Sequence, residues 1–251
     1  MALLKVLLLL GLGVSVNSDV FLQKRIIGGQ NCHDTERLYH VRLESSNGIH
    51  TTLCGGSLIH PEWILTAAHC WKSEDGWTNV ATLKVHPQTA GEQRLVILQA
   101  PKIYTHFGQH HDIMLLKLET PVTDVPLARL PHRRYRLRRG DVVQLAGEGE
   151  TTLSPNNQRL PPDAPIPAHL QCVNMKVDQV SVVMPTFGIL FYVKTPNKDV
   201  CYGDDGGAVV YDGMIYGVIS FGGPYYTCQS HAAVVDVCEY LGWIKFTVGL
   251  I

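Results

Sequence analysis

Three short motifs carry side chains that could transfer protons or attack a carbonyl carbon. His69 lies in LTAAHC at 65–70, Asp112 begins DIMLL at 112–116, and Asp204 and Asp205 adjoin in CYGDDGG at 201–207. Histidine can act as a general base near neutral pH, and a carboxylate can orient it or attack weakly by itself. Taken singly, His69 would be interpreted as a core histidine beside a disulfide cysteine, and Asp112 as an aspartate at the start of a strand.

The elements that must position these motifs are short apolar or alternating segments, many of them separated by Gly, Pro, Asn and Asp clusters. This pattern, with little helical periodicity, indicates an all-β barrel or sandwich. The clearest candidate helix is at the C-terminus, where Tyr240, Leu241, Ile244 and Val248 recur at helical spacing, although Gly242 weakens the prediction. The expected strands are Tyr39–Leu43, Leu53–Leu58, Leu95–Leu98, Ile113–Leu118, Val142–Leu145, Val180–Met184, Gly188–Val193, Ala208–Tyr211 and Met214–Phe221.

Composition limits the class of protein. The 251 residues are enough for one large domain or two small lobes. With 45% apolar and 17% charged residues, nothing suggests disorder. The net charge of −1 predicts binding neither to nucleic acid nor to membranes.

The first residues have the character of a targeting segment. An apolar stretch over 3–14, interrupted only by Lys5, is too short to cross a bilayer. The residues Val16 and Ser18 follow it and fit the small-residue pattern before a cleavage site. We therefore expect a signal peptide over 1–18, cleaved after Ser18, with a short membrane anchor as the alternative. Residues 19–25 form a spacer that ends in Lys24-Arg25. The protein is expected to be secreted, so most of its seven cysteines should be paired and at least one left over.

Taken together, the motifs resemble those of the trypsin/chymotrypsin family of serine proteases, peptidase family S1, in order and in spacing. They cover nearly all of the mature chain, so a protease-like domain is expected over 26–251. The resemblance implies an all-β fold of two six-stranded antiparallel β-barrels with a short C-terminal helix and an active site between the barrels. The matching segments are IIGG after Arg25, LTAAHC, DIMLL, CYGDDGG, Ser220-Phe221-Gly222 and Trp243-Ile244.

The resemblance also assigns roles. His69 is the general base and Asp112 fixes its tautomer, while the backbone N–H groups of Gly203 and Asp205 form the oxyanion hole. Cleavage at Arg25 frees the Ile26 amine, which pairs with Asp204 and orders the substrate pocket. The alternative is that Arg25 lies in a linker which any protease could cut. The pocket residues implied are Asp199, Ser220, Gly222 and Ala232, with a solvated loop acid as the alternative for Asp199.

The family's disulfides imply three pairs here, Cys32–Cys172, Cys54–Cys70 and Cys201–Cys228. Cys238 has lost its usual partner. It is expected to be a buried free thiol or to form a disulfide with another chain.

Asp205 departs from the family pattern, in which serine stands between Asp204 and Gly206. A carboxylate has no proton for His69 to remove at neutral pH, and it should raise the pKa of His69. We therefore expect a non-catalytic protease homologue that binds a protein or polyanion. The alternatives are an endopeptidase with Arg/Lys preference and impaired catalysis, and a site in which Asp205 activates water.

A basic segment is the best indication of a partner, with five arginines in seven residues. It could bind a sulfated glycan or an acidic protein, or be a solvated linker or nick site. No metal or cofactor is expected, because His106, His110 and His111 lie on a loop without a rigid helix to present them. The arginines are Arg133, Arg134, Arg136, Arg138 and Arg139.

Overall fold

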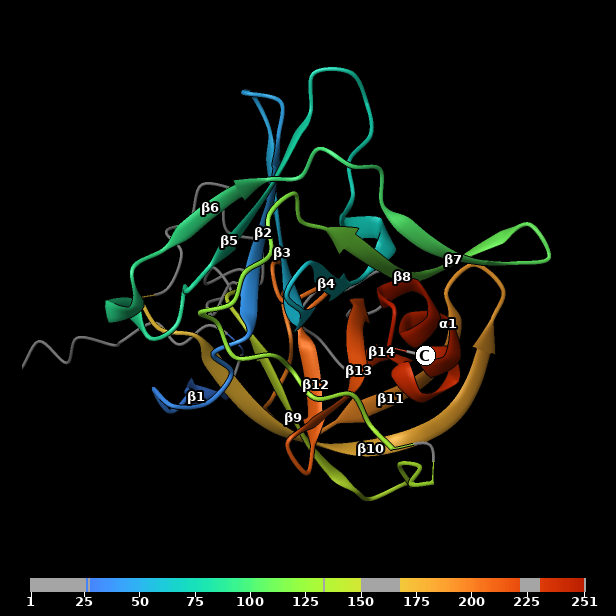
Figure 1. The fold of residues 1–251 in the computed structure, drawn as a ribbon. Coiled ribbons are helices and arrows are strands. Elements are labelled where there is room, and N and C mark those ends of the chain that lie inside the picture. Colours follow the sequence, from blue (N-terminus) through green and yellow to red (C-terminus); the bar gives the residue numbers. More distant parts are fainter. Residues whose placement is uncertain (1–25, 27, 133, 150–167, 222–230, 251) are drawn as a thin grey trace, which may run out of the picture.

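A computed structural model describes residues 26, 28–132, 134–149, 168–221 and 231–250. Within them the chain forms two antiparallel β-sheets, one from each half of the sequence, and a C-terminal α-helix (Figure 1). The predicted all-β fold with a short C-terminal helix is confirmed. The predicted signal peptide, the propeptide, Arg25, Arg133, Gly222 and Cys228 lie outside the described residues.

The N-terminal sheet has the strand order β6-β5-β2-β3-β4-β8-β7. It contains seven strands rather than the six expected, and no pairing between its end strands β6 and β7 occurs among the described residues. Its alternating apolar residues converge on a core that includes the fully buried Leu58, Ile64 and Ile113. The strands are β2 His40–Ser46, β3 Thr51–His60, β4 Trp63–Thr66, β5 Thr78–Leu83, β6 Gln93–Val96, β7 Lys102–His106 and β8 Gln109–Lys117, with the 3₁₀ helices η1 Ala68–Cys70 and η2 Gln88–Ala90.

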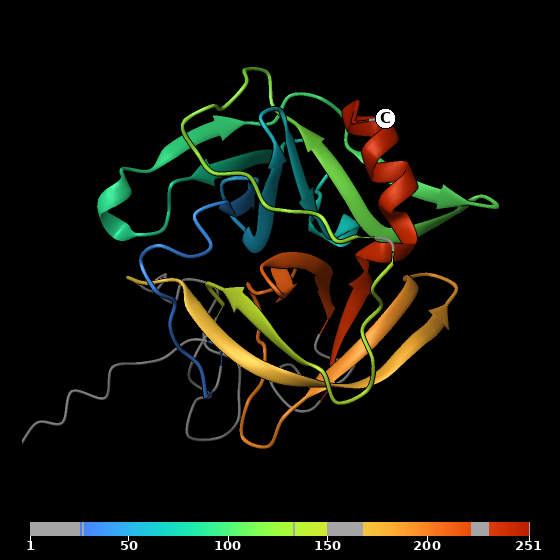
Figure 2. The ribbon, with the colours of Figure 1, turned by 60° about the horizontal axis from the view of Figure 1, so that its bottom comes forward.

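The C-terminal sheet closes into a six-stranded barrel, because β9 pairs with both β10 and β12. The short strand β1 adds to the outside edge of β10. Figure 2 shows this barrel below the N-terminal sheet, with the segment that connects them running down one side. The strands are β1 Gln30–Asn31, β9 Val142–Gly147, β10 Gln171–Met184, β11 Gly188–Lys194, β12 Ala208–Tyr211, β13 Met214–Phe221 and β14 Ala232–Asp236.

The helix α1, Val237–Val248, buries the apolar face that its sequence predicts, and Gly242 is tolerated within it. That face packs into the same apolar cluster as the N-terminal sheet, so the helix joins the end of the chain to its first half (Figure 2). Gly249 ends the helix in the left-handed region with φ 77°, where glycine has no steric penalty. No helix within the described ranges has the length and apolar character that a membrane crossing requires.

Asp236 caps the start of α1, since its side chain accepts a hydrogen bond from the Cys238 N–H at 3.0 Å. Asp236→Ala is expected to lower the free energy of unfolding by about 1 kcal/mol, because that N–H then loses its acceptor. Asp236→Asn should stay close to the parent, since asparagine caps equally well. Chemical denaturation of the three proteins checks this, and equal losses in both variants would contradict it.

Candidate active site

Three side chains meet between the two halves of the molecule. His69 lies on η1, directly after β4, and Asp112 lies in the neighbouring strand β8. Asp205 comes from the C-terminal half, on the loop before β12. His69 Nδ1 is 2.9 Å from Asp112 Oδ2, and His69 Nε2 is 3.6 Å from Asp205 Oδ2. The imidazole therefore lies between two carboxylates, one from each half of the chain.

Asp112 is fixed by several donors although it is only 5% exposed. The His69 backbone N–H donates to Oδ1 at 2.9 Å, and the Ser220 hydroxyl donates to Oδ2. Burial alone would raise the pKa of Asp112, but the hydrogen bonds from His69 and Ser220 lower it below its usual value. Asp112 therefore remains ionised and holds the His69 ring in one orientation.

The pKa of His69 reflects its two acidic neighbours. Burial alone would lower it, but the interactions with Asp112 and then Asp205 outweigh burial and raise the pKa to about 10. At neutral pH the ring is an imidazolium and has no lone pair with which to accept a proton. His69 is placed where a general base would lie, but a protonated ring cannot act as one.

The loop that carries Asp205 is shaped by glycines and anchored to the opposite sheet. Gly203 has φ 96° and Gly206 has φ 79°, which are conformations that favour glycine. A Cβ on Gly206 would lie 2.3 Å from the Gly55 carbonyl oxygen. Gly55 on β3 also donates its N–H to the Asp205 carbonyl oxygen at 2.6 Å. The backbone of Asp205 is therefore fixed by the N-terminal half.

Asp204 is fully buried in a cradle that contains two glycines. Its carboxylate accepts hydrogen bonds from the N–H groups of Gly149 at 2.7 Å and Cys201 at 2.8 Å. A Cβ on Gly147 would lie 2.1 Å from Asp204 Oδ1, so no side chain fits there. Ile26 is also fully buried, in the apolar core of the C-terminal barrel. The pairing of its freed amine with Asp204 stays a prediction.

A buried ion pair beside this cradle was not foreseen from the sequence. Glu148, between the two cradle glycines, is 7% exposed and accepts two hydrogen bonds from the Arg42 guanidinium of β2, at 2.7 and 2.9 Å. His40 Nε2 lies 3.7 Å from the same carboxylate. Arg42 also donates to Glu92 at 3.0 Å. This pair ties the turn that holds Asp204 to the N-terminal sheet.

The predicted pocket residues lie in different surroundings. Asp199 is 5% exposed, and its carboxylate accepts the Val200 N–H at 2.9 Å. Ala232 is fully buried at the start of β14, in the apolar cluster that also contains Val200. Ser220 is fully buried and its hydroxyl binds Asp112, so its side chain supports the histidine–aspartate pair.

Two of the predicted disulfides are present, Cys32–Cys172 and Cys54–Cys70. Cys201 is also disulfide-bonded, and its predicted partner lies outside the described residues. Cys238 is a buried free thiol whose pKa is raised by burial to about 12. Because the thiolate is the species that exchanges disulfides, this burial disfavours a bridge to another chain.

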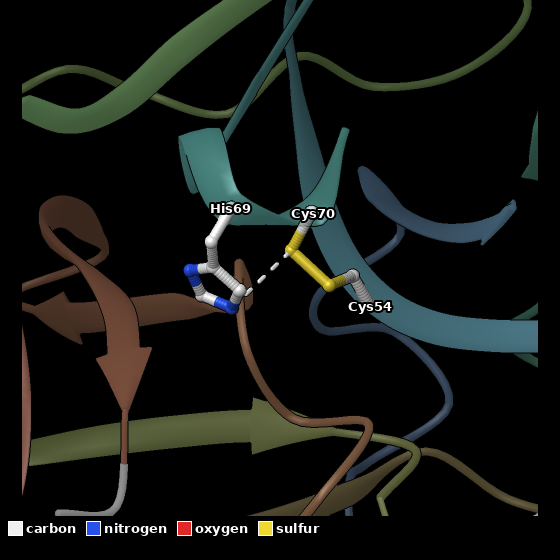
Figure 3. A group of neighbouring side chains, drawn as sticks. All are labelled: Cys54, His69 and Cys70. Carbon is white, nitrogen blue, oxygen red and sulfur yellow. Dashed lines mark hydrogen bonds between the residues drawn. A yellow bond between two sulfur atoms is a disulfide. The ribbon is translucent and has the colours of Figure 1, made fainter. Parts of the chain in front are cut away.

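The Cys54–Cys70 disulfide lies beside the candidate active-site histidine, as Figure 3 shows. His69 Nε2 is 3.8 Å from Cys70 Sγ. Although His69, Cys54 and Cys70 are close enough to share an ion, both sulfurs are bonded to one another. A metal needs thiolate ligands, so this group does not fit one.

The basic segment is divided between two places. Arg136 Nη1 binds Glu239 at 2.6 Å at the start of α1, and Asp236 lies 3.6 Å away. Arg139 Nη2 instead lies 3.5 Å from Asp178 on β10. Of the four described arginines, only Arg134 and Arg138 make no ion pair with a described acid. The segment is therefore not one free cationic run.

Two facing antiparallel sheets with a histidine–aspartate pair between them have the architecture of trypsin-like proteins. The family model described as Trypsin matches residues 26–244, so the chain belongs to the trypsin family. It is 32% identical to anionic trypsin of Canis lupus familiaris over 255 residues, covering 96% of this chain and 97% of that one. It is 33% identical to cationic trypsin-3 of Rattus norvegicus over 240 residues, covering 89% and 90%.

Among solved structures, the chain is similar to neuropsin, a serine protease expressed in the limbic system of mouse brain. The TM-score is 0.69 at 26% identity, covering 88% of this chain and 99% of neuropsin. The trypsin-like fold expected from the motifs is thereby confirmed.

Proposed function

We propose that this chain is a secreted, non-catalytic member of the trypsin family that acts by binding a protein or polyanion. The observation that carries the proposal is the Asp205 carboxylate, 3.6 Å from His69 Nε2 at the position where the family's motif has the nucleophilic serine. The disulfides Cys32–Cys172 and Cys54–Cys70 and the disulfide-bonded Cys201 are consistent with an oxidising compartment.

The chemistry of a carboxylate explains the loss of turnover. A serine hydroxyl forms a bond to the carbonyl carbon as His69 takes its proton, and the product is a stable ester. Asp205 has no proton to transfer, and its attack on an amide would give an anhydride. From the tetrahedral adduct that forms first, the carboxylate leaves more readily than the amine, so the adduct returns to the amide substrate instead of giving the anhydride.

Electrostatics add to this effect. The negative charge that develops on a substrate carbonyl must be stabilised by nearby donors. A fixed carboxylate at residue 205 repels that charge. The imidazolium of His69 cannot act as the base at neutral pH, because its pKa is raised to about 10.

The test compares the parent with Asp205→Ser after cleavage at Arg25. Ester and amide substrates with Arg or Lys are assayed, and a serine-directed organophosphate reports on the nucleophile independently of substrate preference. We expect no turnover and no label at residue 205 in the parent. Parent turnover equal to that of the serine variant would sink the proposal.

A second candidate is an endopeptidase with Arg/Lys preference and impaired catalysis. The observation that favours it is the intact His69–Asp112 pair together with the buried carboxylate of Asp199. If the parent shows weak activity, His69→Ala tests whether it belongs to this site. Activity of this site must fall in the variant, which would support the impaired endopeptidase, whereas activity from a contaminating protease would not change.

A further inference from the structure

The outer face of the C-terminal barrel carries a cluster of basic side chains around one carboxylate. Asp178 on β10 lies 3.1 Å from His231 Nε2, 3.4 Å from Lys194 Nζ and 3.5 Å from Arg139 Nη2. Three basic groups from three separate segments therefore converge on a single acid. We call the basic residues Arg138, Arg139, Lys176, Lys194 and His231 the outer basic cluster.

The strand register brings a further positive charge to this face. Lys176 on β10 is the direct antiparallel partner of Lys194 on β11, so the two side chains leave the sheet on the same side. Like charges placed opposite one another destabilise a sheet unless a counter-charge lies between them. No ion pair joins Lys176 to an acid in the described part of the chain.

The central acid lies at a β-bulge. The β10–β11 register shifts between Val177 and Gln179, which leaves Asp178 without a partner in the ladder. Bulges re-aim the side chain of the extra residue. Asp178 lies at this bulge, among basic groups that remain well exposed, with Arg139 at 79% and Lys194 at 53%.

The two arginines of the cluster lie on an ordered turn. Asp141 accepts the Arg138 N–H at 2.8 Å, and two backbone hydrogen bonds join Gly140 and Asp141 to Val177 of β10. The end of the basic segment is therefore fixed to the barrel. A ligand that binds to an ordered turn causes a smaller loss of conformational entropy than one that binds to a flexible loop.

We propose that the outer basic cluster is an exosite for a sulfated glycan, which deepens the binding function proposed above and rests on it. Sulfates bind where basic groups are closely spaced. The cluster supplies Arg139, Lys194 and His231 around one acid, with Lys176 opposite Lys194 and Arg138 next to Arg139 in the chain. The chain as a whole has a net charge of −1, so retention of a polyanion must come from a local surface. Arg136 is outside the exosite, because it is bound to Glu239.

Heparin chromatography with a salt gradient tests the exosite. We expect the parent to be retained above physiological salt and Lys176→Gln/Lys194→Gln to bind roughly tenfold or more weakly, because two cations are lost from one face. Asp178→Asn should elute at higher salt than the parent, which is a gain that misfolding cannot produce. Arg136→Gln is the matched control from the same basic segment, and it should elute with the parent.

Three outcomes would overturn the exosite. No retention of the parent at physiological salt excludes a glycan site. An equal loss in Arg136→Gln and in the double lysine variant shows that the segment binds as a whole. Competition by poly-glutamate as effective as that of heparin at equal charge identifies an acidic protein surface as the better ligand. None of these outcomes bears on the esterase test, so the non-catalytic assignment can fail or survive separately.

Discussion

Arg42→Met is expected to lower the free energy of unfolding by about 3–5 kcal/mol, because it takes the guanidinium and its two hydrogen bonds away from the buried Glu148 carboxylate. The two side chains are 8% and 7% exposed and share two hydrogen bonds. His40 Nε2 also lies 3.7 Å from the Glu148 carboxylate. Chemical denaturation of the full chain with its disulfides intact measures the change.

Two further variants make this prediction sharp. Arg94→Met breaks the exposed pair with Glu44 and should cost less than about 1 kcal/mol, because solvent screens it. Arg42→Met/Glu148→Leu should regain most of the stability, since an apolar pair leaves no buried charge. A loss below about 1 kcal/mol in Arg42→Met would show that water already solvates Glu148.

His69 is expected to stay protonated up to about pH 10, well above the usual histidine value of about 6.5. Because the folded pKa is the higher one, the stabilisation from this group is fully present below about pH 6.5. It is lost as the pH rises from there to about 10. NMR titration of the imidazole measures the pKa, and denaturation at several pH values measures the stability.

Asp205→Asn separates the two carboxylates. It removes one negative charge beside Nε2 and leaves Asp112 in place, so the pKa of His69 should fall while the ring keeps its orientation. Asp124→Asn removes an exposed carboxylate that is bound to Lys84 and serves as the control. An unchanged His69 pKa in Asp205→Asn would mean that Asp205 does not bind the imidazolium in solution.

The sequence predicted several of the strands whose side chains alternate or form apolar runs, but not β4. Strands β12 and β13 match the expected ranges, because apolar residues fill them and turn residues flank them. Strand β5, Thr78–Leu83, was not predicted, since Thr78 and Asn79 interrupt its apolar pattern. The first half of β10 was missed as well, although Asn174 and Lys176 alternate there with buried residues.

The candidate site could be predicted only where local motifs mark it. His69, Asp112 and Asp204–Asp205 each lie in a short segment with a recognisable pattern. The Arg42–Glu148 pair has no such pattern, because its members are 106 residues apart and meet only after both sheets form. A charged residue within the apolar run Tyr39–Leu43 was the one available signal, since a buried arginine requires a partner.

The close approach of Gly206 to Gly55 has a mechanical consequence. A Cβ there would lie 2.3 Å from a backbone oxygen, and the Gly55 N–H is bound to the loop at 2.6 Å. At this point the two halves therefore touch backbone to backbone, and the Thr66 hydroxyl of β4 lies equally close to the position of that Cβ. Any side chain at residue 206 would therefore push the loop that carries Asp205 away from β3.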